Sequence, residues 1–285
     1  MHRPNYKADI ASYGFTLIEL LVVMVILGIG AALTIGYLVN PIQAFNDMQL
    51  RGRLTERADV ALYRMTRDIR QGVPNSIRIT SSGSIRAIEV LQMRTAGRYR
   101  ASGTGDALDA TGDADSLDVL GGLPGFAAVQ TGGAGIANCI NGVADCLVIY
   151  NTGTSASANN AYDGDNVATI TAASANSISF DNADGNPAFP LLSPAQRLYV
   201  TRGPVSYVCD LGSQEIRRYA GYALQSIQPT FAGGGDLLTN NVSGCNFNYV
   251  PGTNSRNGVV TMEVSISESG ETVTLLQQAH IFNSP

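Results

Sequence analysis

One carboxylate lies inside an otherwise apolar stretch of this sequence. Residues 14–30 read GFTLIELLVVMVILGIG, and Glu19 is the one charged side chain among them. An ionisable group within a membrane-spanning segment is costly and usually functional, because lipid does not solvate its charge. Glu19 is therefore the first candidate functional residue.

The four cysteines form a second set of reactive side chains, at positions 139, 146, 209 and 245. Their number is even, so two disulfides are expected if this part of the chain lies in an oxidising compartment. Sequence order suggests the pairs Cys139–Cys146 and Cys209–Cys245, one of the three connectivities that four cysteines allow. The alternative is four reduced, buried thiols.

Side chains for catalysis or metal binding are otherwise sparse. After the first 14 residues the chain contains one histidine, His280, so neither a cluster of histidine ligands nor a mechanism with two histidines is available. His280 lies within an alternating pattern typical of a strand, which favours a structural role over membership of a catalytic triad. We therefore expect no catalytic residue and no cofactor.

Three acidic segments are the candidates for a metal site, and the largest of them is a cluster of aspartates. Carboxylates in a loop can supply oxygen ligands to calcium, but this cluster lacks the spacing and the glycine of an EF-hand. Its members are Asp106, Asp109, Asp113, Asp115 and Asp118. Segments 163–166 and 181–186 are acidic and turn-like as well. Solvated loops are the expectation for all three, and no metal is predicted.

The element that must position Glu19 is a long apolar helix. From Leu20 to Val39 there are 20 residues without a charge, which as a helix span about 30 Å, the thickness of the hydrocarbon core of a bilayer. Arg3 and Lys7 precede this segment, and the positively charged side should stay in the cytoplasm. Everything after residue 40 then lies outside, which in a bacterium means the periplasm.

Composition excludes one class of partner. Only 14% of the residues are charged, the net charge is −5, and no long basic block is present. Nucleic acid binding is therefore not indicated.

An α+β fold is expected for the chain as a whole. Asn40-Pro41 predicts a kink, because proline lacks the donor that a helix interior needs. Residues 40–72 then continue as an amphipathic helix that ends at Gly72 and Pro74. The residues expected on its apolar face are Leu54, Ala58, Ala61, Leu62, Met65 and Ile69.

Residues 73–285 are expected to form a β-rich head domain, a mostly antiparallel sheet with the helix laid across it. The clearest feature is a hairpin over residues 259–281, with its turn at Glu268–Glu271 and with Met262, Val264 and Ile266 pointing inward. Segments 101–135, 131–138 and 232–238, rich in glycine, are expected to be loops. Other strands are expected at 75–80, 85–93, 146–151, 166–170, 177–180, 196–202, 205–210 and 215–222.

Residues 14–20, GFTLIEL, resemble the N-terminal signature of type IV prepilins and of the pseudopilins of type II secretion. The resemblance implies that a prepilin peptidase cuts between Gly14 and Phe15 and that the new amine of Phe15 is methylated. Residues 1–14 would then be a leader, and residues 15–39 a transmembrane and assembly helix.

The same resemblance implies a role for Glu19. In an assembling fibre, Glu19 of an incoming subunit would pair with the Phe15 amine of the preceding subunit, so that both charges gain a partner in a medium of low dielectric constant. The alternative is that Glu19 lies near the membrane interface, or pairs with its own amine, and has no further role.

A second resemblance covers more of the chain. Residues 40–79 and 275–285 are similar to the MshO group of minor pilins, from the mannose-sensitive haemagglutinin (MSHA) pilus system, which is related to the larger minor pilins of the PilW and GspJ type. Residues 95–175 carry no motif of that group.

Together the resemblances imply a structural, non-catalytic minor pilin that primes or caps an MSHA-like type IV pilus. Its implied location is the inner membrane, with one crossing and a periplasmic head, and the fibre or its tip after assembly. Implied partners are the prepilin peptidase, other major and minor pilins and the assembly platform. Because no lysine would remain after cleavage, a Walker A loop is excluded, and force must come from a cytoplasmic ATPase. The alternatives are a type II secretion pseudopilin, a pilus-tip adhesin and a signal-anchored periplasmic enzyme.

Overall fold

The chain forms two compact units, residues 1–50 and residues 51–285. The computed structural model describes residues 14–108, 114–155, 159–181, 189, 191–231, 233–253 and 256–282. Of residues 35–41 it describes only the helical backbone.

A single long helix, α1, runs from Leu17 to Arg70. Its assignment passes through Asn40 and Pro41 without a break, so the proline does not end the helix. Within the first unit, the described side chains of α1 are exposed up to residue 49. The expected long helix with an apolar first half is confirmed.

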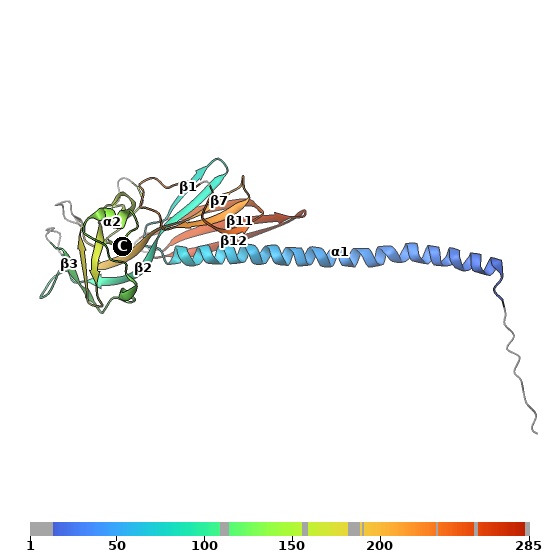
Figure 1. The fold of residues 1–285 in the computed structure, drawn as a ribbon, viewed down its shortest axis with the longest axis horizontal. Coiled ribbons are helices and arrows are strands. Elements are labelled where there is room, and N and C mark those ends of the chain that lie inside the picture. Colours follow the sequence, from blue (N-terminus) through green and yellow to red (C-terminus); the bar gives the residue numbers. More distant parts are fainter. Residues whose placement is uncertain are drawn as a thin grey trace, which may run out of the picture. The chain divides into compact units, whose positions relative to one another are not determined.

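The last turns of α1 belong to the second unit and carry the predicted apolar face. The six buried positions on this face are Leu54, Ala58, Ala61, Leu62, Met65 and Ile69. Two exposed arginines of these turns, Arg51 and Arg57, form ion pairs with Glu271 (2.6 Å) and Glu268 (3.0 Å), at the tip of the hairpin between β11 (Gly258–Glu268) and β12 (Glu271–Ile281) (Figure 1). Exposed ion pairs of this kind contribute little to stability, so burial of the apolar face is the main force that holds these turns on the rest of the second unit.

Nine of the twelve described strands form one sheet, and all its pairings are antiparallel. The order across it is β1-β2-β3-β6-β5-β4-β7-β8-β9, with a further pairing between β2 and β7. The strands are β1 (Arg78–Ser82), β2 (Ile85–Tyr99), β3 (Ser116–Leu120), β4 (Cys146–Val148), β5 (Val167–Ala173), β6 (Ser177–Asp181), β7 (Arg197–Asp210), β8 (Glu215–Ala220) and β9 (Asp236–Asn240).

The additional β2–β7 pairing closes part of this sheet on itself. Strands β2, β3, β6, β5, β4 and β7 form a ring in which each pairs with the next and β7 pairs with β2. The ring is a small barrel filled by side chains, as expected for so few strands. Its interior includes Tyr99, Leu117, Leu147, Ile170, Phe180 and Val200.

The length of β2 and β7 explains how the barrel joins the open part of the sheet. They contain 15 and 14 residues. One half of each strand lies in the barrel, where Gly97 pairs with Leu198, and the other half lies in the open sheet, where Ile88 pairs with Tyr207. The register between β2 and β7 is irregular around Met93, at the boundary between the two parts.

A second sheet contains β10 (Val242–Val250), β11 (Gly258–Glu268) and β12 (Glu271–Ile281). The predicted hairpin is confirmed, with Glu268 opposite Glu271 and a two-residue turn between them. Both turn residues, Ser269 and Gly270, have positive φ angles of 52° and 86°, the requirement of a type I′ turn. Met262, Val264 and Ile266 are fully buried, as expected.

Several assignments made from the sequence were wrong in detail. Segment 101–135 contains β3 as well as loops, a short helix α2 (Ile136–Ile140) begins within 131–138, and β9 begins within 232–238. The two strands expected at 196–202 and 205–210 are one strand, β7, and β10 was not expected.

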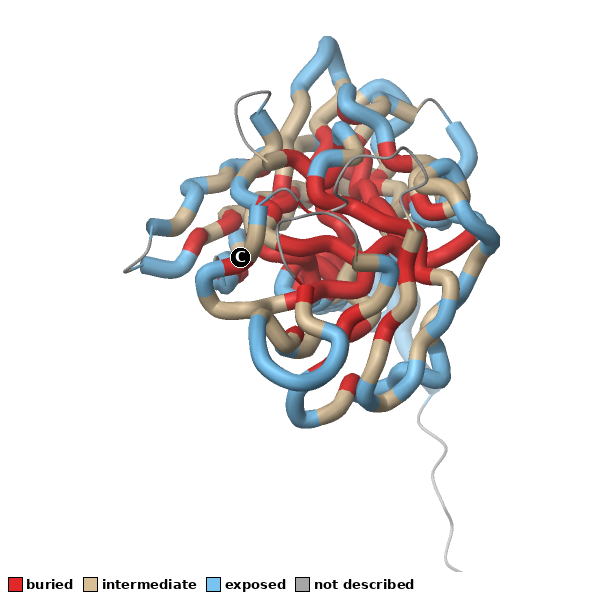
Figure 2. The backbone as a smooth tube through the Cα atoms, turned by 90° about the vertical axis from the view of Figure 1, so that its left-hand side faces the viewer, coloured by how far each residue is buried: buried red, intermediate tan, exposed pale blue. Residues whose placement is uncertain are grey.

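Strand β3 was missed because its apolar side chains are few and gain their burial from partners distant in sequence. In β3 only Leu117 and Val119 are buried, and both lie in the barrel core. Figure 2 shows such buried residues gathered in the interior of the second unit, with exposed residues at the turns. The glycine just before β9 is required by the backbone. At Gly235 (φ 70°) a Cβ atom would come within 2.8 Å of the Arg218 carbonyl oxygen, so a side chain does not fit there.

The structure contains the disulfides Cys139–Cys146 and Cys209–Cys245, the pairs that sequence order suggests. Cys209 lies on β7 and Cys245 on β10, so the second disulfide joins the two sheets. Its residues are 36 apart, against 7 for the first.

We expect the Cys209→Ser/Cys245→Ser double variant to lose about 3–4 kcal/mol of stability. This disulfide closes the longer loop, so it removes more conformational entropy from the unfolded chain. The Cys139→Ser/Cys146→Ser double variant is the matched control and should lose less. Urea unfolding of both proteins in a neutral detergent measures the difference, and non-reducing peptide mapping tests the pairing. Four alkylatable thiols in protein isolated without a reductant, or a larger loss in the control, would contradict the prediction.

Candidate functional site

The start of α1 combines an exposed backbone with a specific cap. Gly14, Phe15 and Thr16 are not helical, and α1 begins at Leu17. The Glu19 N–H donates to the Thr16 carbonyl oxygen (3.1 Å) and to Thr16 Oγ1 (3.3 Å). Thr16 is thus the N-cap and Glu19 the third residue of the helix, the spacing of a capping box.

This cap gives Glu19 a local role that the sequence-based reasoning missed. A carboxylate in the first turn interacts favourably with the positive end of the helix dipole. The sequence signal for this role was present, because residues 16–19 read T-L-I-E. A test of Glu19 must therefore separate capping of the helix from pairing between subunits.

The surface that follows Glu19 is apolar and unburied. One window, Leu17–Thr34, is long and apolar enough to span a membrane, and none of it is buried within the protein. Phe15, Leu17 and Ile18 are 74%, 84% and 71% exposed. So much contiguous apolar surface needs lipid or other helices around it.

Gly14 is not required by the fold. A Cβ atom at this position would meet nothing within 4 Å, and the residue has no left-handed φ angle. Steric fit and backbone conformation thus leave the choice of glycine unexplained. Recognition of residues 14–15 by another protein would explain it.

In the second unit, a buried carboxylate on α1 connects this helix to the open part of the nine-stranded sheet. Asp68 is 1% exposed, and its Oδ2 atom accepts hydrogen bonds from Tyr207 Oη (2.7 Å) and Arg218 Nε (3.0 Å). Arg67 also donates to Oδ1 (3.3 Å). Burial by itself would raise the pKa of Asp68, but the hydrogen bonds from Tyr207 and Arg218 outweigh it and hold the pKa below its usual value.

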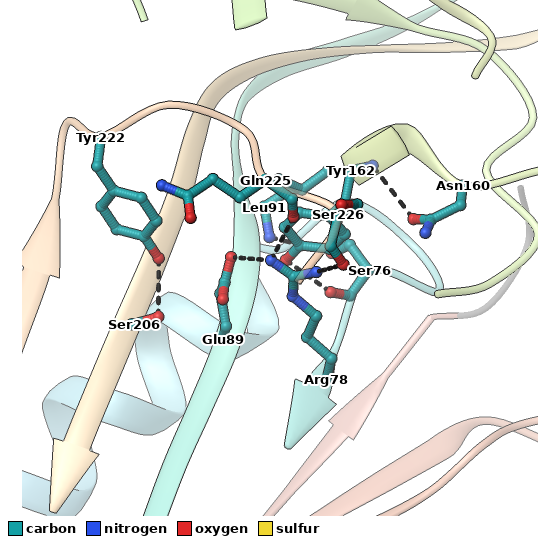
Figure 3. A network of polar contacts seen from close by, with 10 residues as sticks. All are labelled: Ser76, Arg78, Glu89, Leu91, Asn160, Tyr162, Ser206, Tyr222, Gln225 and Ser226. Carbon is teal, nitrogen blue, oxygen red and sulfur yellow. Dashed lines mark hydrogen bonds and ion pairs between the residues drawn. The ribbon is translucent and has the colours of Figure 1, made fainter. Parts of the chain in front are cut away.

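A second buried pair anchors the segment after β8 (Figure 3). Arg78 on β1 donates to Glu89 on β2 (3.0 Å) and to the carbonyl oxygens of Gln225 and Ser226, and its guanidinium lies 3.7 Å above the centre of the Tyr162 ring. Burial raises the pKa of Glu89, although Arg78 acts in the opposite direction. The partners of this pair are backbone carbonyls and an aromatic ring, so its arrangement connects segments rather than activating a nucleophile.

The residues considered for metal binding or catalysis do not converge in the described part of the chain. No group of three or more His, Cys, Asp or Glu side chains that could hold a metal is found there. Asp118 pairs with Arg100 (3.0 Å), and Asp106 accepts a hydrogen bond from Ser116. Asp109, Asp113 and residues 182–186 lie outside the described residues, while His280 is exposed on β12.

Comparison with known proteins identifies the same N-terminal region. Residues 11–35 match the prokaryotic N-terminal methylation motif. No curated protein and no solved structure matches the chain.

The motif and the fold agree on the class of protein. An apolar N-terminal helix followed by a mostly antiparallel β-domain is consistent with a pilin fold, and the methylation motif supports a type IV pilin-like protein, a pilin or a pseudopilin. This class is structural rather than enzymatic, and it implies processing by a prepilin peptidase and assembly with other pilins.

Proposed function

We propose that this protein is a minor pilin that primes or caps assembly of an MSHA-like type IV pilus. The observation that carries the proposal is the exposed apolar helix with one carboxylate, Glu19, in its first turn. The helix anchors the subunit in the inner membrane before assembly and packs among the helices of other pilins afterwards. Glu19 pairs with the Phe15 amine of the preceding subunit.

The head domain supports a position at the end of a fibre. It contains two sheets and a closed barrel, and long loops and short helices connect its strands. A subunit with such a large head fits best where no further subunit stacks above it. The head lies in the periplasm before assembly, which agrees with its two disulfides.

Gene context separates this function from its main alternative. Neighbouring genes for a pilus favour the minor pilin, whereas neighbouring genes for type II secretion favour a pseudopilin. Presence of the protein in sheared pili tests the proposal directly, and its absence from pili whose other minor pilins are detected would refute it.

Cleavage between Gly14 and Phe15 is the first expected step. We predict that Gly14→Val blocks cleavage without unfolding the head, because residue 14 is exposed and a Cβ atom there would meet nothing within 4 Å. Gly28→Ala is the matched control, since its added Cβ also meets nothing within 4 Å, and it should be processed normally. Mass spectrometry of membrane-extracted protein reads the N-terminus. If the wild-type protein begins at Met1, or after residue 30, its assignment as a pilin-like protein is wrong.

A further inference from the structure

A basic pocket opens where the barrel joins the open sheet. It has a volume of about 380 Å³ and lies between β2, β7, β8 and the turn after α2. The polar side chains that line it are those of Gln92, Arg94, Gln130, Arg202 and Arg218. Among the described residues that line the pocket there is no carboxylate.

The pocket is built by the irregular register between β2 and β7. Around Met93 the two strands lose their regular pairing, and the Thr201 hydroxyl fills the gap by donating to the Gln92 carbonyl oxygen (2.9 Å) and accepting from the Gly203 N–H (3.1 Å). Bulges of this kind re-aim side chains and are common beside functional sites. Here Arg94 and Arg202 both face the same pocket from neighbouring strands.

Two of the arginines are held in place from behind. Arg94 pairs with Asp145 (3.3 Å), which also accepts the Gln130 N–H (2.8 Å), and Arg218 pairs with Asp68 (3.0 Å). Both carboxylates are 1% exposed, so they fix the guanidinium groups without reaching the pocket surface. A ligand then meets ordered donors and pays less entropy for immobilising them.

Arg202 supplies the positive charge that is not neutralised. The charge of Arg202 acts to lower the pKa of Asp145. Arg202 itself is exposed and forms no hydrogen bond or ion pair within the residues that the structure describes. The chain as a whole has a net charge of −5, so three arginines around one pocket are a local exception. Clefts lined by one sign of charge concentrate ligands of the opposite sign.

We propose that this pocket binds the carboxylate or phosphate group of a ligand about the size of one sugar. Planar guanidinium groups match the paired oxygens of these anions, and the amides of Gln92 and Gln130 add neutral hydrogen bonds for hydroxyl groups. The volume lies at the lower end of the range for small-ligand sites. The ligand that supplies this anionic group is either a free phosphate or an acidic sugar residue.

Calorimetry on the full-length protein in a neutral detergent tests the proposal with glucuronate, inorganic phosphate and glucose. We expect saturable binding of an anionic probe, no binding of glucose, and affinity about tenfold weaker in Arg202→Gln, which loses one charge-assisted contact. Displacement of phosphate by glucuronate points to an acidic sugar, and phosphate binding alone points to the free ion.

Arg98→Gln is the matched control, because Arg98 is an exposed arginine on β2 outside the pocket lining. It should bind the anion as the wild type does, and near-UV circular dichroism should show the same fold for both variants. Absence of saturable binding of either anion at millimolar concentration, equal binding of glucose, or equal losses in the two variants would overturn the proposal.

Discussion

Replacing Glu19 with alanine is expected to remove this protein from assembled fibres while leaving leader cleavage and membrane insertion intact. In the pairing proposed above, loss of the carboxylate leaves the Phe15 amine of a neighbouring subunit unpaired in a medium of low dielectric constant, at a cost of about 1–3 kcal/mol or more. A cost in this range lowers incorporation by about fivefold to a hundredfold or more at equilibrium. The amount of this protein in sheared fibres, measured against its amount in the membrane, reports the effect.

Three further variants separate pairing from helix capping. Thr16→Val removes the side-chain acceptor for the Glu19 N–H but keeps the carboxylate, so it should assemble if pairing is what matters. Glu19→Asp should be intermediate, because it keeps the charge with a shorter reach, and Glu19→Gln should fail like alanine. Normal incorporation of Glu19→Ala, or an equal defect in Thr16→Val, would show that pairing between subunits is not the role of this carboxylate.

Replacing Asp68 with alanine is expected to destabilise the head by about 3–5 kcal/mol, the cost of breaking a buried ion pair by removing one partner. Arg218, with a side chain only 14% exposed, would keep its charge without its hydrogen-bonded acceptor, and Tyr207 would lose its acceptor as well. Asp59→Ala is the matched control, an exposed aspartate on the same helix, and should change stability by about 0.5 kcal/mol or less. Urea unfolding monitored by near-UV circular dichroism measures both variants.

The pH dependence of the Asp68 contribution has a definite sign. The pKa of Asp68 is lower in the folded protein than in the unfolded chain, so the folded state favours the ionised carboxylate. Its stabilisation is complete above the unfolded pKa of about 3.9 and is lost as the pH falls through the lower folded value. The stability difference between wild type and Asp68→Ala should therefore shrink below about pH 4. A difference that grows on acidification would contradict this account of the site.

The sequence by itself determined the features that depend on neighbours along the chain. The helix from Leu17 to Arg70, its apolar face ending at Ile69 and the β11–β12 hairpin all follow from local periodicity and turn chemistry. The prepilin-like segment at Gly14–Leu20 is also local, because a short run of side chains is what a processing enzyme reads. The two cysteine pairs were predictable for a related reason, since four cysteines allow only three connectivities and sequence order suggested the one observed.

Only the tertiary structure decided how the head closes and where its charges meet. The β2–β7 pairing joins segments about a hundred residues apart, such as Gly97 and Leu198, and closure of the barrel depends on it. The short strand β3 obtains its burial from partners that are distant in sequence, so local patterns did not reveal it. The same holds for Asp68 with Arg218, and for Arg94 beside Arg202. Long-range pairing places these charges within reach of one another, because electrostatic contact depends on distance in space and not along the chain.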